Sequence, residues 1–158
     1  MTVLVTGGAG YIGSHMVLDL MKTGEEIVVL DDFSTGFPGL VPAGVRVVEG
    51  DIGNRKLLER LIPDYRIDAI AHFAAKIVVP ESVDKPLFYY DNNTSRARTL
   101  IEAAVNGGVK HFIFSSTAAV YGNAETMPVT EETPPNPVSP YGRSKLMVEW
   151  MLEDARVA

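Results

Sequence analysis

Residues 6–13 read TGGAGYIG, between an apolar segment at Thr2–Val5 and a segment with helical spacing of apolar residues at 14–21. This order predicts a strand, a glycine-rich turn and a helix. Glycine lets the backbone turn tightly and lets a ligand approach without a Cβ in the way. The start of a helix attracts an anion through its unpaired N–H groups, so the context is typical of a turn that binds a dinucleotide pyrophosphate. Contacts are expected from Gly7, Gly10, Tyr11, Ile12 and Gly13.

A carboxylate follows this turn at a distance typical of dinucleotide sites. Asp31 closes a predicted strand at Ile27–Leu30 and lies 18 residues beyond Gly13. A carboxylate near this spacing accepts hydrogen bonds from the adenosine ribose hydroxyls. It also repels a 2′-phosphate, and the next residues, Asp32 and Phe33, provide no arginine to bind one. We therefore expect NAD rather than NADP; the alternative is that Asp31 only caps a loop.

Composition excludes several classes of function. The 158 residues are 46% hydrophobic and 22% charged, which suits one domain with a real core. The net charge is −6 and no Lys/Arg cluster occurs, which argues against a nucleic-acid surface. No apolar run reaches membrane-spanning length, and because Met1–Val3 begins a strand at once we expect no cleavable signal.

The cysteine and histidine content of the chain also gives little sign of a metal or redox site. Cysteine is absent, which excludes disulfides and thiol catalysis and favours a reduced, cytoplasmic setting. The three histidines, His15, His72 and His111, stand singly without metal-site spacing, so we expect no bound metal.

Strand and helix patterns alternate along the rest of the chain. Further strands are expected at 45–49, 69–73 and 112–115, and helices at 54–62, 86–106 and 141–156, with loops at 33–44 and around Pro80. This alternation predicts an α/β fold: a Rossmann-like, doubly wound parallel sheet of about five strands. We expect one NAD-binding domain over residues 1–158 and no second domain. Ligands of such sheets bind at the carboxyl ends of the strands, where the candidate residues stand.

Tyr141 and Lys145 lie four residues apart at the start of the last predicted helix, so both side chains share one face. A nearby ammonium favours phenolate and lowers a tyrosine pKa from about 10. Such a tyrosine can take a proton from a substrate alcohol. Thr117, at the end of the fifth strand, could hold the substrate oxygen. The alternatives are a solvated helix face for the pair and a strand-end backbone contact for the threonine.

Long segments of the chain carry a resemblance to a known family. They are TGGAGYIGSH at 6–15, LDDFSTG at 30–36, EGDI at 49–52, HFAAK at 72–76, PESVDKPLFYYDNN at 80–93, FSSTAAVYG at 114–122 and SPYGRSKLMVE at 139–149. Together they resemble the extended short-chain dehydrogenase/reductases and, within that family, the UDP-glucose 4-epimerases.

The resemblance implies an NAD-dependent isomerase of galactose metabolism. Tyr141 would remove the 4′-hydroxyl proton of UDP-galactose or UDP-glucose, with transient hydride transfer from C4 to NAD and back to the other face. Lys145 would bind the nicotinamide ribose and tune Tyr141, and Thr117 would orient the sugar hydroxyl. The same likeness implies that NAD is lined by Asp31, Asp32, Phe33, Ser34, Thr35, Gly36, Asp51, Ile52, Phe73, Ala74, Ala75, Lys76 and Asn92.

The chain departs from the family in length. It has about half the usual number of residues, so it resembles the N-terminal NAD-binding part only, without the family's last strands and C-terminal substrate lobe. UDP-sugar contacts outside this part would be lost, which would impair turnover. In the family, the helices at 86–106 and 141–156 pair across a dimer, and the fifth strand would be an exposed edge. We therefore expect a homodimer or a larger oligomer.

Three functions remain open from the sequence: an epimerase, a non-catalytic NAD-binding module or fragment, and an NAD(H)-dependent carbonyl reductase or another sugar-nucleotide-modifying relative. The family's 4,6-dehydratases carry an Asp and a Glu directly after the threonine, where this chain has Ala118 and Ala119. That argues against a dehydratase. The segments at 72–76 and 80–93 favour the epimerase over the reductase.

Overall fold

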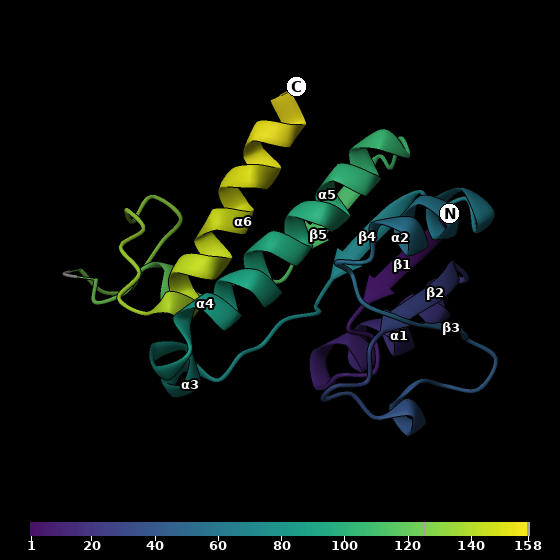
Figure 1. Ribbon diagram of the computed structural model, residues 1–158, viewed down its shortest axis with the longest axis horizontal. Coiled ribbons are helices and arrows are strands. Elements are labelled where there is room, and N and C mark those ends of the chain that lie inside the picture. The colour runs from purple at the N-terminus through teal and green to yellow at the C-terminus, as the bar shows by residue number, and fades with distance from the viewer. Residues whose placement is uncertain (125, 158) are drawn as a thin grey trace. The chain divides into compact units, whose positions relative to one another are not determined.

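Strand β1, Thr2–Thr6, is buried along its whole length and lies at the centre of a five-stranded parallel sheet in the computed structural model (Figure 1). The structure describes residues 1–124 and 126–157. The strand order is β3-β2-β1-β4-β5 and every pairing is parallel. The other strands are β2 at Glu26–Asp31, β3 at Arg46–Glu49, β4 at Ala69–His72 and β5 at His111–Phe114. The predicted Rossmann-like parallel sheet is confirmed, with strand ends that differ from the prediction by one residue at most.

Helices cover both faces of this sheet, as a doubly wound fold requires. Side chains alternate along β1, so that Val3 and Val5 pack in one core with Val17 of helix α1, Tyr11–Thr23. Leu4 enters a second core instead, with residues of α2, Arg55–Asp64, and α5, Arg96–Asn106. The period-two pattern of one short strand thus divides the core between two faces.

The backbone contacts separate the chain into two compact units. Unit 1 consists of Met1–Ala75 and Thr99–Ser115 and contains the sheet. Unit 2 consists of Lys76–Arg98 and Ser116–Ala158. Unit 2 is built on helix α6, Pro140–Val157, and on the short helices of its first segment.

The first segment of unit 2 differs from the sequence prediction. The expected loop around Pro80 is helix α3, Val79–Asp84, because a proline in the first turn of a helix lacks only an N–H that the helix does not use. The expected helix at 86–106 is confirmed as one helical segment, but it is not α-helical throughout. It begins as α4, Pro86–Tyr89, passes through a π-helical turn, Tyr90–Ser95, and continues as α5.

Two shorter 3₁₀ helices complete the described structure, at Pro38–Leu40 in unit 1 and at Ala118–Val120 in unit 2. The second follows the end of β5 and lies against α6. Across residues 1–124 and 126–157, no helix has both the length and the apolar character needed to cross a membrane.

Replacing Leu100 with alanine tests the packing of α5 on the sheet. Leu100 is 0% exposed, so Leu100→Ala leaves a cavity and is expected to lower the free energy of unfolding by about 2–5 kcal/mol. Val105→Ala on the same helix is the matched control, because Val105 is 57% exposed and its loss is expected to change stability by about 0.5 kcal/mol at most. Urea unfolding followed by circular dichroism measures both. Equal effects of the two substitutions would contradict the packing described.

Candidate functional site

The glycine turn of unit 1 is held in place by a backbone contact that only glycine permits. A Cβ on Gly13 would lie 2.1 Å from the carbonyl oxygen of Gly7. Gly7 itself has φ +70° and would place a Cβ 2.6 Å from the backbone nitrogen of Ala74. The first turn of α1 therefore packs directly on the turn that precedes it, and that turn packs on the segment after β4.

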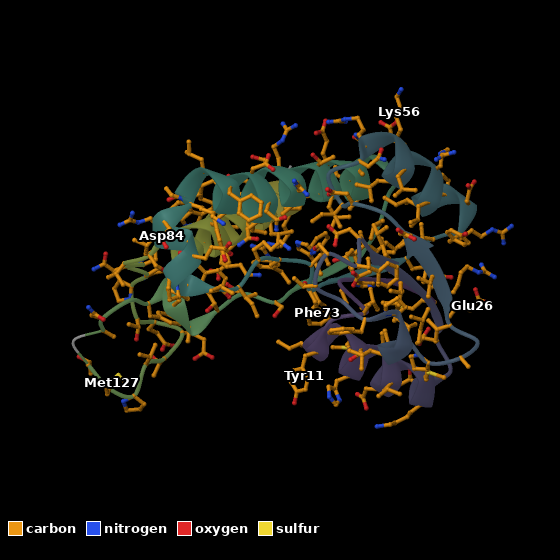
Figure 2. All side chains as sticks on the ribbon, turned by 60° about the horizontal axis from the view of Figure 1, so that its bottom comes forward. Tyr11, Glu26, Lys56, Phe73, Asp84 and Met127 are labelled. Carbon is orange, nitrogen blue, oxygen red and sulfur yellow. The ribbon has the colours of Figure 1, made fainter. Side chains whose placement is uncertain are left out.

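The start of α1 is suited to an anionic ligand. Gly10 is the residue before the helix and provides no side-chain cap, and the first turn carries no acidic side chain. The dipole end is therefore not neutralised by the chain's own carboxylates there. Tyr11, labelled in Figure 2, and Ile12 are exposed on this first turn. The Tyr11 ring contacts His15 edge-on at 5.0 Å between centroids.

Asp31 is buried at the end of β2, and both of its carboxylate oxygens accept backbone hydrogen bonds. Oδ2 accepts from the N–H of Ala9 at 2.9 Å, and Oδ1 accepts from the N–H of Phe33 at 2.9 Å. The carboxylate thus supports the glycine turn and shapes the loop that follows β2, as the loop-capping alternative predicts. A carboxylate has about four acceptor positions, so these two bonds leave capacity for ribose hydroxyls.

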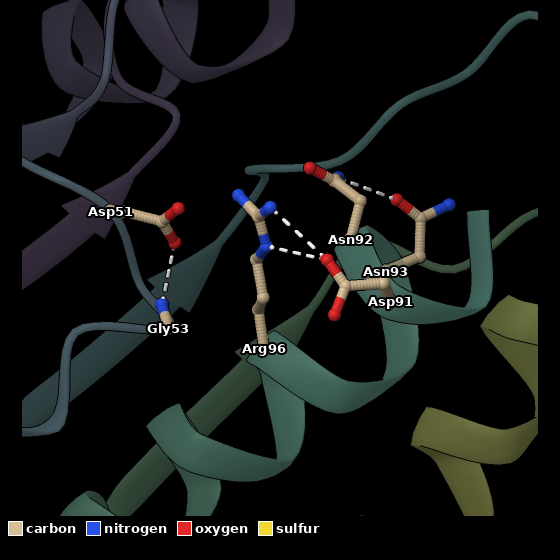
Figure 3. A network of polar contacts seen from close by, with 6 residues as sticks. All are labelled: Asp51, Gly53, Asp91, Asn92, Asn93 and Arg96. Atoms are coloured by element: carbon tan, nitrogen blue, oxygen red, sulfur yellow. Dashed lines mark hydrogen bonds and ion pairs between the residues drawn. The ribbon is translucent and has the colours of Figure 1, made fainter. Parts of the chain in front are cut away.

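The remaining predicted residues of unit 1 lie in loops after β2, β3 and β4. Asp32 accepts from the N–H of Ser34 at 2.9 Å, and Asp51 accepts from the N–H of Gly53 at 2.6 Å (Figure 3). Both bonds are local turn contacts. Ile52 is buried. The other predicted residues are exposed or half-buried, namely Thr35, Gly36, Phe73, Ala74 and Ala75.

Unit 2 begins at Lys76, whose backbone is held by a buried side chain. Oδ1 of Asn93 accepts from the N–H of Lys76 at 2.9 Å, and Nδ2 of Asn93 donates to the carbonyl oxygen of Lys76 at 2.9 Å. Asn92, the predicted cofactor ligand, donates to Oδ1 of Asn93 at 3.0 Å (Figure 3). Both asparagines belong to the π-helical turn, a form that often occurs at functional sites.

The same asparagine reaches helix α6. Its Nδ2 donates to the hydroxyl of Ser144 at 3.1 Å, and that hydroxyl donates to the carbonyl oxygen of Tyr141 at 2.7 Å. The N–H of Tyr141 donates to the hydroxyl of Ser82 of α3 at 3.2 Å. The backbone of Tyr141 is therefore fixed from both sides by buried polar groups.

Tyr141 and Lys145 lie in the first two turns of α6, and both are buried, with exposed fractions of 8% and 3%. Burial lowers the pKa of Lys145 from 10.5 to about 8, because removal from water disfavours the ammonium, while the negative charge of Glu149 acts in the opposite direction. The pair is therefore not a solvated helix face, the alternative that the sequence left open.

Thr117 stands before the 3₁₀ helix, where its hydroxyl accepts from the N–H of Ala119 at 3.2 Å. This is the backbone contact considered as an alternative for the threonine. The O–H of the same group can still donate to another oxygen. Thr117 lies in unit 2 together with Tyr141 and Lys145.

Sequence reasoning missed the polar groups that hold these residues, namely Ser82, Asn93, Ser144 and Glu149. The doublet Asn92–Asn93 within a predicted helix was a signal, since asparagine is disfavoured in helix interiors. In the part of the chain that the structure describes, no three His, Cys, Asp or Glu residues are grouped as a metal site.

Comparison with known proteins gives a consistent result. The model of the NAD dependent epimerase/dehydratase family matches residues 3–158. A UDP-glucose 4-epimerase of Azospirillum brasilense is 54% identical over 156 residues, which are 99% of this chain and 45% of that protein. The crystal structure of a Brucella ovis UDP-glucose 4-epimerase in complex with NAD matches with a TM-score of 0.96 at 42% identity, over 99% of this chain and 48% of that one.

A second solved structure, the UDP-Glc/GlcNAc 4-epimerase of Campylobacter jejuni, matches with a TM-score of 0.96 at 45% identity, over 99% of this chain and 49% of that one. The chain thus spans about half the length of the relatives it matches. The predicted resemblance to this group of enzymes, over part of their length, is confirmed.

Lys145→Met tests the burial of the ammonium. Between pH 8 and 10.5 the folded chain releases the Lys145 proton while the unfolded chain keeps it, so stability rises with pH across this window. At pH 7 both states are protonated and burial costs up to about 3 kcal/mol, which methionine removes. We expect the variant to be more stable than wild type at pH 7 and to lack the rise.

Guanidinium unfolding at pH 7 and pH 10 measures this difference, and Lys56→Met, on the exposed face of α2, is the control. If the stability of wild type and of Lys145→Met depended on pH in the same way, the ammonium of Lys145 would not be buried in solution.

Proposed function

The chain belongs to the NAD-dependent epimerase/dehydratase family, and from this premise we propose that it carries the cofactor-binding and catalytic part of a UDP-hexose 4-epimerase that interconverts UDP-galactose and UDP-glucose. The observation that carries the proposal is the buried pair Tyr141 and Lys145, whose helix is fixed through Ser82 and Ser144. The proposal is supported by the 54% identity to a UDP-glucose 4-epimerase.

The residues of unit 1 suit the adenosine and pyrophosphate of NAD. The uncapped start of α1 and the close backbone packing of Gly7 and Gly13 leave N–H groups for the phosphates. Asp31 keeps acceptor capacity for the ribose hydroxyls, and Asp32 beside it disfavours a 2′-phosphate. In unit 2, Asn92 and Lys76 are the proposed contacts of the nicotinamide half. When bound, NAD supplies the acceptor and then the donor of the hydride at C4 of the sugar.

The residues of α6 perform the proton chemistry. Tyr141 takes the proton of the 4′-hydroxyl as C4 is oxidised and returns it when the hydride comes back to the other face. The ammonium of Lys145 would donate to the ribose hydroxyls of the bound cofactor. Thr117 donates its hydroxyl proton to the sugar oxygen and so orients it. Tyr141 and Lys145 are buried and Thr117 is half-buried, and removal from bulk water strengthens such polar interactions.

The surroundings of Thr117 favour epimerisation over elimination of water. The two residues after it are Ala118 and Ala119, which form the 3₁₀ helix and have no acid or base to offer. A dehydratase needs such a pair at this position, as the resemblance implies. Return of the hydride to the same carbon therefore remains as the outcome after the oxidation.

A second candidate function concerns these 158 residues taken alone. Because it spans about half of its relatives, contacts to the UDP-sugar provided by their other half are not part of these 158 residues. Binding energy remote from the reacting carbon is what positions a substrate for reaction. A non-catalytic NAD-binding module is therefore the alternative, and it differs from the first in turnover but not in NAD affinity.

The proposal includes a homodimer or larger oligomer in a reduced, cytoplasmic setting. Met147 and Trp150 lie three residues apart on α6 and are both exposed, Trp150 by 54%. Side chains three apart share one helix face, and an exposed tryptophan beside a methionine is typical of a protein interface.

Gly13→Ala tests the role of the glycine turn in NAD binding. The added Cβ would meet the carbonyl oxygen of Gly7, so the turn must shift and its N–H groups move away from the phosphates. We expect NAD affinity to fall by at least about tenfold. Gly39→Ala is the control, because a Cβ there meets no atom within 4 Å. Isothermal titration calorimetry with NAD measures both, and equal affinity of the two variants would contradict the assignment.

Tyr141→Phe tests the proposed function directly. The substitution removes only the hydroxyl, so turnover of UDP-galactose to UDP-glucose is expected to be abolished while NAD remains bound. Tyr65→Phe is the control, since Tyr65 lies in unit 1 and packs on Arg46. Product formation is measured by chromatography, with bound NAD quantified in the same samples.

Each outcome has a distinct meaning. Turnover by wild type that persists in Tyr141→Phe would refute Tyr141 as the base. Bound NAD with no turnover in any variant would favour the non-catalytic module. Absence of NAD from the wild-type chain would refute the proposed function as a whole.

A further inference from the structure

A hydrogen bond that the proposed chemistry does not use links two parts of unit 2. The hydroxyl of Ser116 donates to Oε1 of Glu149, although the two residues are 33 positions apart in the chain. Both side chains are half-buried. Ser116 directly precedes Thr117, and Glu149 lies on α6, so the bond ties the segment that carries the threonine to the helix that carries Tyr141.

Glu149 also has a fixed relation to Lys145. It follows Lys145 by four residues on α6, and side chains at this spacing lie on the same face of a helix. The negative charge of Glu149 raises the pKa of Lys145 against the larger, opposite effect of burial. A carboxylate held at this place by Ser116 therefore stabilises the ammonium that burial disfavours.

The elements packed against α6 bring other titratable groups, from α3, α4 and the π-helical turn. They are Glu81, Asp84, Lys85, Tyr89, Tyr90 and Asp91, and Arg96 directly follows the π-helical turn as the first residue of α5. Glu81 is engaged by Lys85 at 3.1 Å and by the Tyr89 hydroxyl at 2.9 Å, and Asp91 is paired with Arg96 at 3.1 Å. The 3₁₀ helix Ala118–Val120 has no ionisable side chain. The negative charge of Glu149 acts on Lys145 in the direction that favours the ammonium.

We propose that Glu149, fixed by Ser116, is the positioning residue that keeps the side chain of Lys145 charged and aligned beside Tyr141. The inference rests on the proposed function in that it assigns Lys145 a role in the reaction. The hydrogen bond between Ser116 and Glu149 then has two effects. It anchors the residue next to Thr117, and it holds a counter-charge one helical turn beyond Lys145.

The titration of Lys145 in the 158-residue chain tests this directly and needs neither NAD nor turnover. Chains labelled with ¹³C-lysine are titrated by NMR, with the Lys145 signal assigned by its absence from Lys145→Met. Glu149→Gln keeps an oxygen that can accept from Ser116 but removes the charge. We expect the Lys145 midpoint to fall by on the order of one pH unit.

Two further variants complete the test. Glu153→Gln, one turn farther along α6 and exposed, removes an equal charge and is expected to leave the midpoint unchanged. Ser116→Ala keeps the carboxylate but releases it, and we expect a smaller fall in the same direction. Thermal unfolding of each variant reports any purely structural effect. If Glu149→Gln does not fold, Ser116→Ala decides the outcome.

The proposal would be overturned if the titration midpoint of Lys145 were unchanged in Glu149→Gln, or if it shifted equally in Glu153→Gln. A loss of thermal stability without a shift of the midpoint would show that Glu149 has a structural role only. Failure of the proposed function is recognised separately, because it appears as a wild-type chain without NAD affinity or as turnover that survives Tyr141→Phe.

Discussion

The lack of room for a Cβ on Gly13, which would lie 2.1 Å from the carbonyl oxygen of Gly7, is the constraint on which unit 1 depends. With any side chain at position 13, helix α1 could not begin where it does. Its place on the sheet decides where Val17 packs and how the turn meets the segment after β4. The same contact leaves the start of the helix open to a ligand, so core packing and anion binding depend on one backbone arrangement.

Unit 2 depends on a carboxamide instead of a glycine. Asn93 satisfies both backbone groups of Lys76, donates to Ser144 and accepts from Asn92, so that all four of its hydrogen-bonding positions are used. A buried polar group in this position stabilises the structure only when all its partners are present. The π-helical turn is what directs Asn93 inward, because the wider turn changes the face on which the following residues lie.

Sequence patterns predicted the regular elements of the sheet well, and for a clear reason. Strands such as Thr2–Val5 are short apolar runs that are buried on both faces, which is typical of a parallel sheet. Helix α3 was missed because Pro80 and its neighbours resemble a loop when read without their partners. Val78 donates to the hydroxyl of Tyr89 at 3.1 Å, a contact between residues 11 positions apart that no local pattern contains.

The residues that we propose as the reacting groups were predictable from the sequence, but the residues that hold them in place were not. Tyr141 and Lys145 follow from spacing on one helix, whereas Ser82 and Glu149 act on them only through the folded chain. Burying a lysine opposes folding, because the charged form loses its hydration. An apolar side chain at position 145 would avoid this cost, and the retention of a buried cation beside a buried tyrosine is typical of a site where stability is reduced in favour of chemistry. The carboxylate of Glu149 lessens this cost without removing it. The pKa of Lys145 is therefore about 8, and near that pH a small change in its surroundings alters its charge.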